Sequence, residues 1–451
     1  MARWLYIPVE VKVRELQAKT LLAAMAARAG YKVVLGRKAE LMALLPYVPR
    51  GTFLGMWAQE NFLKFYKNLK SRGFAISVMD EEGLVTFSDD IYRSIKLSDD
   101  TLSYVDLFLS WGAHQSQVIR GCNPNPPPVL AETGNIRFDI LRPEFRHLLQ
   151  KGADELREKH GRFILIVSSF GLCNHFSGAE SYFETLKKNK VIRTEADEKC
   201  LRSYMELQKK VFESLLVAVP KVAAAFPEHT IIVRPHPSED HTKWTNAAGD
   251  ATNVKLIREG DIHQWLLAAE ADVHHFCTSA LESFVADIPS IAYRPFKEPE
   301  IESDLPYRGS LSAETPEQLI ESLKRITSGE LEELQALRRT ARPHLKNYIA
   351  NLDGAFAYEQ MLTAMETHAP ETGETISCST ICTRRIRAVL VQIYRGLKKI
   401  IGRGENYVDH KFPSFRKKEI ADIIKEIPDA GKINIKKIDQ FCFLLDHENA
   451  R

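Results

Sequence analysis

A four-residue stretch in the second half of the chain could do chemistry on a phosphate. It reads Arg-Pro-His-Pro at 234–237 and follows the β-branched run 230–233. The two prolines prevent further strand pairing, so Arg234 and His236 stand where a buried parallel strand should end, the edge at which such sheets bind ligands. A guanidinium or an imidazole there can bind a phosphate. The stretch, including Pro237, therefore predicts a nucleotide site; the alternative is a surface loop whose Arg and His are solvated.

The loop that follows the apolar run 163–167 is a second candidate. It carries small hydroxyls, a glycine, an asparagine and a histidine. Such side chains suit a loop that wraps a polar ligand, so Ser168 and Asn174 are candidate nucleotide-binding residues.

A third candidate lies directly after the run 272–276. Thr278 and Ser279 are expected to cap a helix that reaches Ala286, with Glu282 in its first turn. The N-terminus of a helix attracts phosphate through its free N–H groups. Capping hydroxyls are common, so this signal is weak unless it shares a sheet edge with Arg234 and His236.

Carboxylates gather at two strand ends in the first half of the chain. Glu10 lies between the predicted strand 4–9 and a helix, and Asp80, Glu81 and Glu82 follow the predicted strand 74–79. A carboxylate at such an edge can act as a nucleophile or a general base. The alternatives are a solvated acidic turn and, for Glu10, a favourable place near a helix N-terminus.

Five further residues of the first half are candidates for acceptor binding. Arg14 begins the first predicted helix, and His114 begins a helix after the strand 105–109, where it could instead cap that helix. Asn135, Arg137 and Asp139 lie in a turn-forming stretch at 133–139.

Strands and helices alternate along most of the chain, which predicts an α/β protein with two domains. The expected domains are 1–140 and 141–366. Residues 367–382 look like a linker, and 383–451 a helical appendage.

The appendage begins with a basic amphipathic segment. Residues 383–403 contain seven basic and no acidic residues, with apolar residues at helical spacing. This pattern predicts a helix that lies on a membrane surface; the alternative is a helix docked on the body with its charges outward. Two further helices are expected at 417–426 and 436–445.

Several classes of protein are disfavoured by the sequence. It lacks the P-loop, the dinucleotide-binding glycine fingerprint, the Gly-x-Ser-x-Gly elbow and a clear Asp-x-Asp metal motif. A transferase that acts on a nucleotide-linked donor, without a metal or other cofactor, is what remains.

Composition sets further bounds. A net charge of +2 argues against a nucleic-acid partner. Seven scattered cysteines without a Cys-x-x-Cys pair indicate reduced thiols in a cytoplasmic protein. We also expect no signal peptide and no membrane-spanning segment.

Four stretches carry a family resemblance. They are 6–15, Asp-Glu-Glu-Gly at 80–83, Thr-Gly-Asn-Ile-Arg-Phe-Asp at 133–139, and Arg-Pro-His-Pro at 234–237. Together they resemble the bacterial surface carbohydrate biosynthesis proteins. More distantly, residues 1–365 are similar to GT-B-type transferases that use CMP-activated sugars, such as the Kdo and sialic acid transferases of capsule and lipopolysaccharide assembly.

The resemblance implies two Rossmann-like domains that face a cleft, with the donor nucleotide on the second (141–366) and a glycan or lipid-linked glycan acceptor on the first (1–140). It implies that His236 and Pro237 contact CMP and that Thr278 and Ser279 lie near its phosphate. The carboxylates at 80–82 and Glu10 would face the acceptor. The chain departs from the family pattern at Ile136, where a proline is usual, so that turn is expected to be less rigid.

Three other functions stay open. A CDP-alcohol phosphotransferase of the teichoic acid kind would also use a His-Pro loop, and a UDP-sugar epimerase would need no acceptor. A third possibility is a scaffold without catalytic activity that holds assembly enzymes at the inner face of the membrane.

Overall fold

The computed structural model describes residues 2–86, 88–189, 191–383, 386, 412 and 415–448. Within them the chain forms two compact units. Unit 1 comprises 1–81, 97–140 and 349–451, and unit 2 comprises 82–96 and 141–348. The basic segment 383–403, predicted to lie on a membrane, falls almost entirely outside the described residues.

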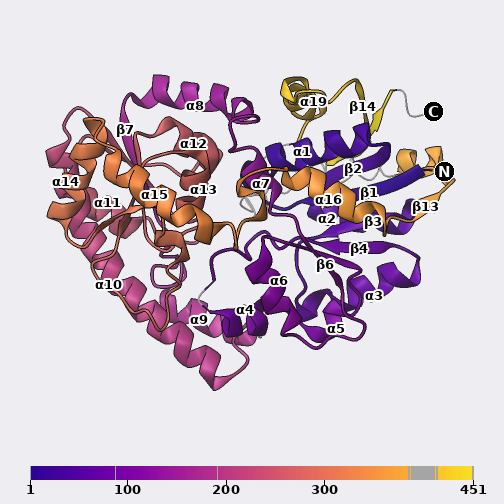
Figure 1. Ribbon diagram of the computed structural model, residues 1–451, viewed down its shortest axis with the longest axis horizontal. Helices are drawn as coiled ribbons and strands as arrows, with labels where there is room; N and C mark the ends of the chain where they lie inside the picture. Colours follow the sequence, from indigo (N-terminus) through magenta and orange to yellow (C-terminus); the bar gives the residue numbers. More distant parts are fainter. Residues whose placement is uncertain are drawn as a thin grey trace, which may run out of the picture. The chain divides into compact units, whose positions relative to one another are not determined.

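Unit 1 is built on a largely parallel sheet (Figure 1). Six parallel strands lie side by side in the order β2, β1, β3, β4, β5, β6, and three antiparallel strands extend them: β13 beside β1, and β15 and then β14 beyond β2. Their bounds are β1 (Ala2–Val9), β2 (Tyr31–Arg37), β3 (Thr52–Gly55), β4 (Ala75–Val78), β5 (Leu107–Ser110), β6 (Val129–Glu132), β13 (Glu371–Thr372), β14 (Ile433–Asp439) and β15 (Cys442–His447).

The helices of unit 1 connect these strands and pack on the sheet. They are α1 (Lys12–Arg28), α2 (Lys38–Leu44), α3 (Leu63–Ser71), α5 (Asp99–Leu102), α6 (Ala113–Arg120), α7 (Ile136–Asp139), α16 (Ala357–Glu366) and α19 (Lys417–Glu426), with short 3-10 helices at Leu45–Tyr47, Glu60–Phe62 and Ala350–Leu352.

Unit 2 contains a six-stranded, fully parallel sheet in the order β12, β11, β10, β7, β8, β9. The strands are β7 (Phe163–Val167), β8 (Thr230–Arg234), β9 (Val254–Leu256), β10 (Ala271–His274), β11 (Ser290–Tyr293) and β12 (Leu311–Ala313). The helices are α4 (Asp89–Lys96), α8 (His147–His160), α9 (Ala179–Lys188), α10 (Glu195–Ala225), α11 (Thr242–Ala248), α12 (Ile262–Ala268), α13 (Ser279–Ala286), α14 (Pro316–Thr327) and α15 (Glu332–Leu345), with a 3-10 helix at Leu305–Tyr307.

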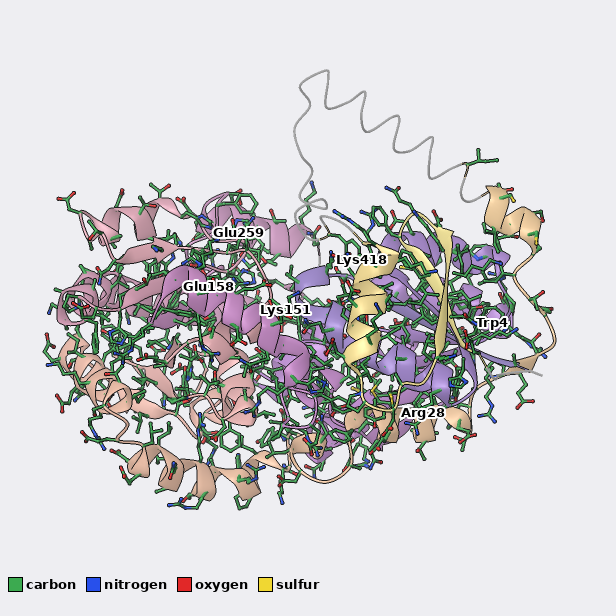
Figure 2. The ribbon with its side chains drawn as sticks, turned by 90° about the horizontal axis from the view of Figure 1, so that it is seen from above. Trp4, Arg28, Lys151, Glu158, Glu259 and Lys418 are labelled. Carbon is green, nitrogen blue, oxygen red and sulfur yellow. The ribbon has the colours of Figure 1, made fainter. Side chains whose placement is uncertain are left out.

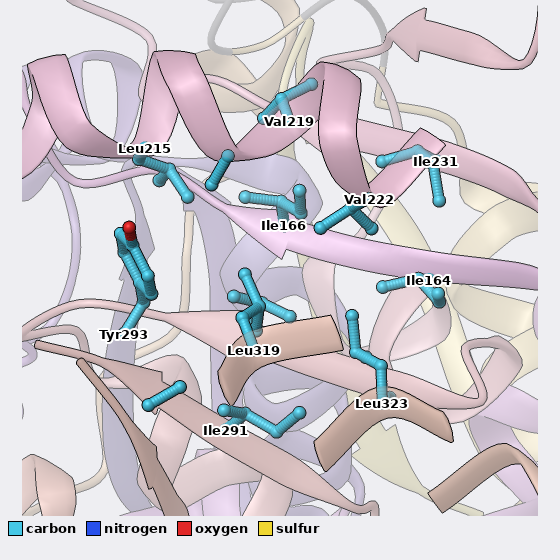
Figure 3. Close-up of a cluster of buried hydrophobic side chains, with 14 of the residues drawn as sticks. Ile164, Ile166, Leu215, Val219, Val222, Ile231, Ile291, Tyr293, Leu319 and Leu323 are labelled. Atoms are coloured by element: carbon cyan, nitrogen blue, oxygen red, sulfur yellow. The ribbon is translucent and has the colours of Figure 1, made fainter. Parts of the chain in front are cut away.

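Apolar side chains of the strands pack with those of the helices to form the core of unit 2. Because parallel strands are covered on both faces, β7 can consist of apolar residues alone. Ile164 and Ile166 pack with Val222 of α10 and Leu323 of α14 in one buried cluster (Figure 3). This packing fixes β7 and its neighbour β8, from whose ends the candidate loops emerge.

The predicted α/β class with parallel sheets is confirmed. The two units divide the chain differently from the predicted domains, and unit 1 also includes the predicted linker and appendage from 367 onward. Residues 82–96 belong to unit 2, and 349–366 belong to unit 1, where α16 packs on α7 and α1.

The end of the chain holds one confirmed and one wrong prediction. The helix expected at 417–426 is α19, with the same bounds. The helix expected at 436–445 is wrong, since these residues belong to the hairpin of β14 and β15. The physical reason is the alternation of apolar and polar residues from Ile433, which suits a strand with one buried face, interrupted by a bulge between Lys437 and Asp439.

Two absences apply to the described part of the chain. No helix in it is long and apolar enough to cross a bilayer. The same residues contain no group of three or more His, Cys, Asp or Glu side chains that could hold a metal ion.

The pairing of β15 with β2 requires a glycine at position 36. A Cβ atom on Gly36 would lie 2.6 Å from the Cys442 Sγ and 3.0 Å from the Phe441 carbonyl oxygen. We expect Gly36→Val to separate the hairpin from β2, to lower the free energy of unfolding by about 1–3 kcal/mol, and to speed amide hydrogen exchange in 442–447. Gly373→Val is the control, because nothing lies within 4 Å of its Cβ position. Unchanged exchange in Gly36→Val would contradict this pairing.

Candidate functional site

Two neighbouring strands of unit 2 end side by side in the predicted loops. Val167 of β7 pairs with Arg234 of β8, so Ser168 and the 235–240 loop start at the same level of the sheet. The backbone N–H of Ser168 also donates to the Arg234 carbonyl at 3.0 Å. The structure therefore brings the first two candidate loops together at one carboxyl edge.

A buried carboxylate holds these two loops. Glu239 is 3% exposed. It accepts hydrogen bonds from the Ser168 hydroxyl at 2.7 Å, from the Phe170 and His236 backbone N–H groups at 3.0 Å each, and from the Trp244 indole at 3.0 Å. Burial raises the pKa of Glu239, and these donors act in the opposite direction. The carboxylate thus replaces water as the acceptor for donors from both loops.

A glycine allows the loops to approach closely. A Cβ atom on Gly171 would lie 2.3 Å from the Ser238 hydroxyl and 3.0 Å from Nδ1 of His236. Asn174 adds a further link, since its buried amide donates to the Asp240 carbonyl at 2.9 Å. Ser168 and Asn174, predicted to bind the nucleotide, thus hold the loops together; a direct role for them stays a prediction.

The imidazole of His236 has a defined hydrogen-bond arrangement. Its Nδ1 accepts from the Ser238 N–H at 3.3 Å and lies 2.8 Å from the Ser238 hydroxyl. Since Nδ1 is an acceptor, the neutral ring carries its proton on Nε2. The residue is exposed, as is Pro237 beside it. An exposed imidazole with an Nε2 proton can donate to a phosphate oxygen.

Arg234 has a structural role that the sequence did not indicate. Its guanidinium donates to the Glu259 carbonyl at 2.7 Å and to the Gly260 carbonyl at 2.6 Å. The Trp265 ring centroid lies 5.8 Å from it. Burial lowers the pKa of Arg234 to about 10. These contacts fix the loop between β9 and α12, and phosphate binding by Arg234 itself stays a prediction.

The third candidate loop follows β10, which lies beside β7 in the same sheet. The predicted capping by Thr278 is wrong, because its side chain makes no capping hydrogen bond. Its backbone is already helical (φ −61°, ψ −26°), whereas capping hydroxyls usually sit on an extended residue. Phe276, two residues earlier, has φ +42°, a left-handed conformation that is unusual for a large side chain. Ser279 is 2% exposed, so its hydroxyl is buried.

Glu282 takes part in a buried charge cluster. Its carboxylate lies 3.3 Å from Nε2 of His263, whose Nδ1 lies 3.0 Å from Asp261. Burial alone would lower the pKa of His263, but the two carboxylates raise it to about 9. His263, whose contact with Glu282 connects α12 to α13, was not among the residues that the sequence indicated.

The carboxylates predicted at 80–82 lie in different environments. Asp80 is buried, and its carbonyl accepts from the Trp111 indole at 2.6 Å. Glu81 is buried 3.1 Å from the ammonium of Lys19. Glu82 belongs to unit 2 and pairs with Lys96 at 3.0 Å. The three consecutive acids therefore do not form one acidic surface, and their catalytic roles remain predictions.

Lys19 is the centre of a buried ion network in unit 1. Besides Glu81 it contacts the Glu15 carboxylate at 2.7 Å and the Pro8 carbonyl at 2.7 Å. Burial opposes the charge of both partners, but their attraction prevails: the pKa of Lys19 is raised and that of Glu15 is lowered. Glu15 also accepts from the Glu10 N–H at 2.9 Å. The network therefore joins the ends of β1 and β4.

The remaining candidates around Glu10 lie near this network. The Glu10 carboxylate pairs with Lys38 at 3.0 Å. The Arg14 guanidinium lies 3.4 Å from Glu15. His114 is half-buried in the first turn of α6. Their predicted catalytic or acceptor-binding roles are not tested by these contacts.

The turn at 135–139 contacts the segment that starts at residue 349, with which the chain returns from unit 2 to unit 1. The Asn135 side chain caps α7 by accepting from the Arg137 N–H at 2.9 Å. The Arg137 guanidinium donates to the Glu81 carbonyl at 3.0 Å. Asp139 accepts from the Asn351 amide at 2.7 Å and from the Ala357 N–H at 2.9 Å. These buried contacts have a structural role, so acceptor binding by these residues stays a prediction.

No family model and no curated protein matches this sequence. Among solved structures, a protein described as a UDP-N-acetylglucosamine 2-epimerase from Listeria monocytogenes is similar, with a TM-score of 0.51 and 13% identity over 82% of this chain and 97% of that chain. The wall teichoic acid polymerase TagF, in a variant soaked with CDPG, has a TM-score of 0.51 and 9% identity over 81% of this chain and 88% of that chain. At these identities the likeness shows the fold alone: two α/β units of GT-B-like type.

The role of Glu239 can be tested with Glu239→Gln. The amide places N–H groups against N–H donors, so we expect the free energy of unfolding to fall by about 1–3 kcal/mol. Urea unfolding measures this change. Glu259→Gln is the control, since Glu259 is exposed in a nearby loop of unit 2 (Figure 2). Equal stability of the two variants would contradict the role of Glu239.

The His263 cluster predicts a pH dependence of stability. The folded pKa of about 9 exceeds the unfolded value of about 6.5. The stabilisation is therefore complete below about pH 6.5 and is lost as pH rises through about 9. We expect the unfolding free energy of the wild type, relative to His263→Gln, to fall by up to about 3 kcal/mol across that range. Exposed His241→Gln should keep the wild-type profile; parallel profiles for His263→Gln and the wild type would contradict the assignment.

Proposed function

We propose that the protein is a transferase that uses a cytidine nucleotide donor to build a bacterial surface glycan, with CMP as the leaving group. The observation that carries this proposal is the arrangement of His236. Its Nδ1 accepts from Ser238 N–H, and its backbone N–H is held by buried Glu239. The Nε2 proton of an exposed, oriented imidazole can stabilise the charge that builds on a departing phosphate.

The first candidate donor is a CMP-activated sugar of the Kdo or sialic acid kind. The acceptor hydroxyl would attack the anomeric carbon, the bond from that carbon to the phosphate oxygen would break, and CMP would leave with the electron pair. The family resemblance of the four stretches, including 80–83 and 234–237, supports this donor. Asp80, Glu81, Glu82 and Glu10 are the proposed sources of a base or nucleophile.

The second candidate donor is a CDP-alcohol. The acceptor hydroxyl would attack the β-phosphorus, the bond to the bridging oxygen would break, and CMP would again leave. The fold likeness to the wall teichoic acid polymerase TagF, whose structure was soaked with CDPG, supports this candidate. In both reactions negative charge builds on the phosphate of the departing CMP, so His236 would have the same role in both.

The acceptor and the cellular place of the reaction are part of the proposal. A lipid-linked glycan acceptor would suit an enzyme at the inner face of the cytoplasmic membrane. Deletion of 383–403 should then move the protein from the membrane fraction to the soluble fraction. An unchanged distribution would exclude attachment through this segment.

The proposed function is tested first by binding and then by product. We expect CMP and CDP to raise the thermal midpoint of unfolding more than UDP or GDP, since a ligand of the native state stabilises it. With CMP-sialic acid, CMP-Kdo or CDP-glycerol and a glycan acceptor, CMP release should be detected. Transfer of phosphorus from the donor to the glycan product would identify the CDP-alcohol reaction, and a product that gains no phosphorus would identify the sugar transfer.

His236→Asn should lower the rate of CMP release by about 10²–10⁴, the usual range for loss of a proton-donating group. His241→Asn is the matched control, because His241 is an exposed histidine shortly after the same loop. Equal rates for both variants would contradict the role of His236. Stabilisation by UDP but not by CMP or CDP, with conversion of a UDP-sugar when no acceptor is present, would instead favour an epimerase.

A further inference from the structure

Arg258 lies at the same sheet edge as His236, two residues beyond the end of the next strand, β9. β9 pairs in parallel with β8, and Leu256 is the partner of Val233. Arg258 therefore follows its paired position by two residues, and His236 follows its own by three. The Arg258 guanidinium reaches the neighbouring loop, where its Nη1 lies 3.5 Å from the Pro237 carbonyl. The guanidinium of Arg258 and the imidazole of His236 thus come from the ends of adjacent strands.

The charge of Arg258 is not neutralised by a carboxylate in the part of the chain that the structure describes. Its contact with Pro237, at 3.5 Å, is long for a hydrogen bond. Arg294 of the same unit, by comparison, lies 3.4 Å from a Glu302 carboxylate oxygen. Two acids lie close to Arg258 in sequence. The exposed Glu259 forms no ion pair with it among the described residues, and Asp261 accepts from the His263 N–H and pairs with the His263 ring. A half-buried guanidinium without an acidic partner favours an anionic ligand.

The loop that carries Arg258 is held in place by other residues. Arg234 donates to the Glu259 and Gly260 carbonyls at 2.7 and 2.6 Å, and the Trp265 indole donates to the Glu259 carbonyl at 2.8 Å. Gly260 has φ +82°, which a glycine adopts without strain. The backbone next to Arg258 is therefore fixed before any ligand binds, which reduces the entropy lost on binding.

We propose that Arg258 binds the phosphate of the donor nucleotide, and that Arg234 acts as a positioning residue that fixes the Arg258 loop. This inference rests on the proposed function, because it assumes a nucleotide at this edge. The residue that binds the phosphate is then Arg258, in the loop after β9, rather than Arg234 or the buried Ser279. A guanidinium can engage two phosphate oxygens at once, while His236 donates to a third.

Calorimetric titration with CMP, CDP and cytidine tests the assignment. Arg258→Ala should weaken CMP and CDP binding at least tenfold and should lower the dependence of affinity on salt. Binding of cytidine, which lacks the phosphate, should not change. Arg258→Lys keeps the charge but loses the paired donors, so we expect an intermediate affinity.

Arg339→Ala is the matched control. Arg339 is an exposed arginine on α15 of the same unit, so its removal changes the net charge equally. Its affinity for CMP and CDP should equal that of the wild type. The thermal midpoint of each variant without ligand shows whether it is folded.

The outcomes separate the two claims. If the wild type binds CMP or CDP and Arg258→Ala binds as tightly as Arg339→Ala, the assignment of Arg258 is wrong while the proposed function stands. If Arg258→Ala weakens cytidine as much as CMP, the residue does not act on the phosphate and the assignment is also wrong. If the wild type binds none of the cytidine ligands, the proposed function itself fails.

Discussion

The buried carboxylate of Glu239 is the constraint on which the candidate site depends. A charge in the interior of a protein is tolerated only where donors replace water, and here they come from the loops after β7 and β8 and from α11. Because the bonds reach the backbone of Phe170 and His236, the carboxylate determines the path of both loops. The orientation of the His236 ring follows from that path and from Ser238.

The same principle operates in both units, each considered by itself. Unit 1 buries Lys19 between Glu15 and Glu81, and this network holds the backbone next to Glu10. Unit 2 uses Arg234 to hold a loop through backbone carbonyls. Glu81 and Arg234, which the sequence suggested as ligand contacts, therefore also take part in contacts that hold neighbouring backbone in place.

The sequence predicted the elements whose pattern is local. Apolar, β-branched runs predicted β7 and β8 closely, and the helix expected at 417–426 is α19. The hairpin at 433–447 was missed because its apolar alternation is interrupted by a bulge, so that its spacing resembles a helix. Glu239 was missed because an acid in a proline-rich loop is usually solvated. No local pattern distinguishes Arg234 from Arg258, since the contacts of each depend on where the loop after β9 lies.

The decisive measurement for this site is a crystal structure of the protein with bound CMP. We expect phosphate oxygens within hydrogen-bond distance of the His236 ring and the Arg258 guanidinium, with the Glu239 bonds to Phe170 and His236 intact. CMP bound away from the loops that follow β7, β8 and β9 would contradict it.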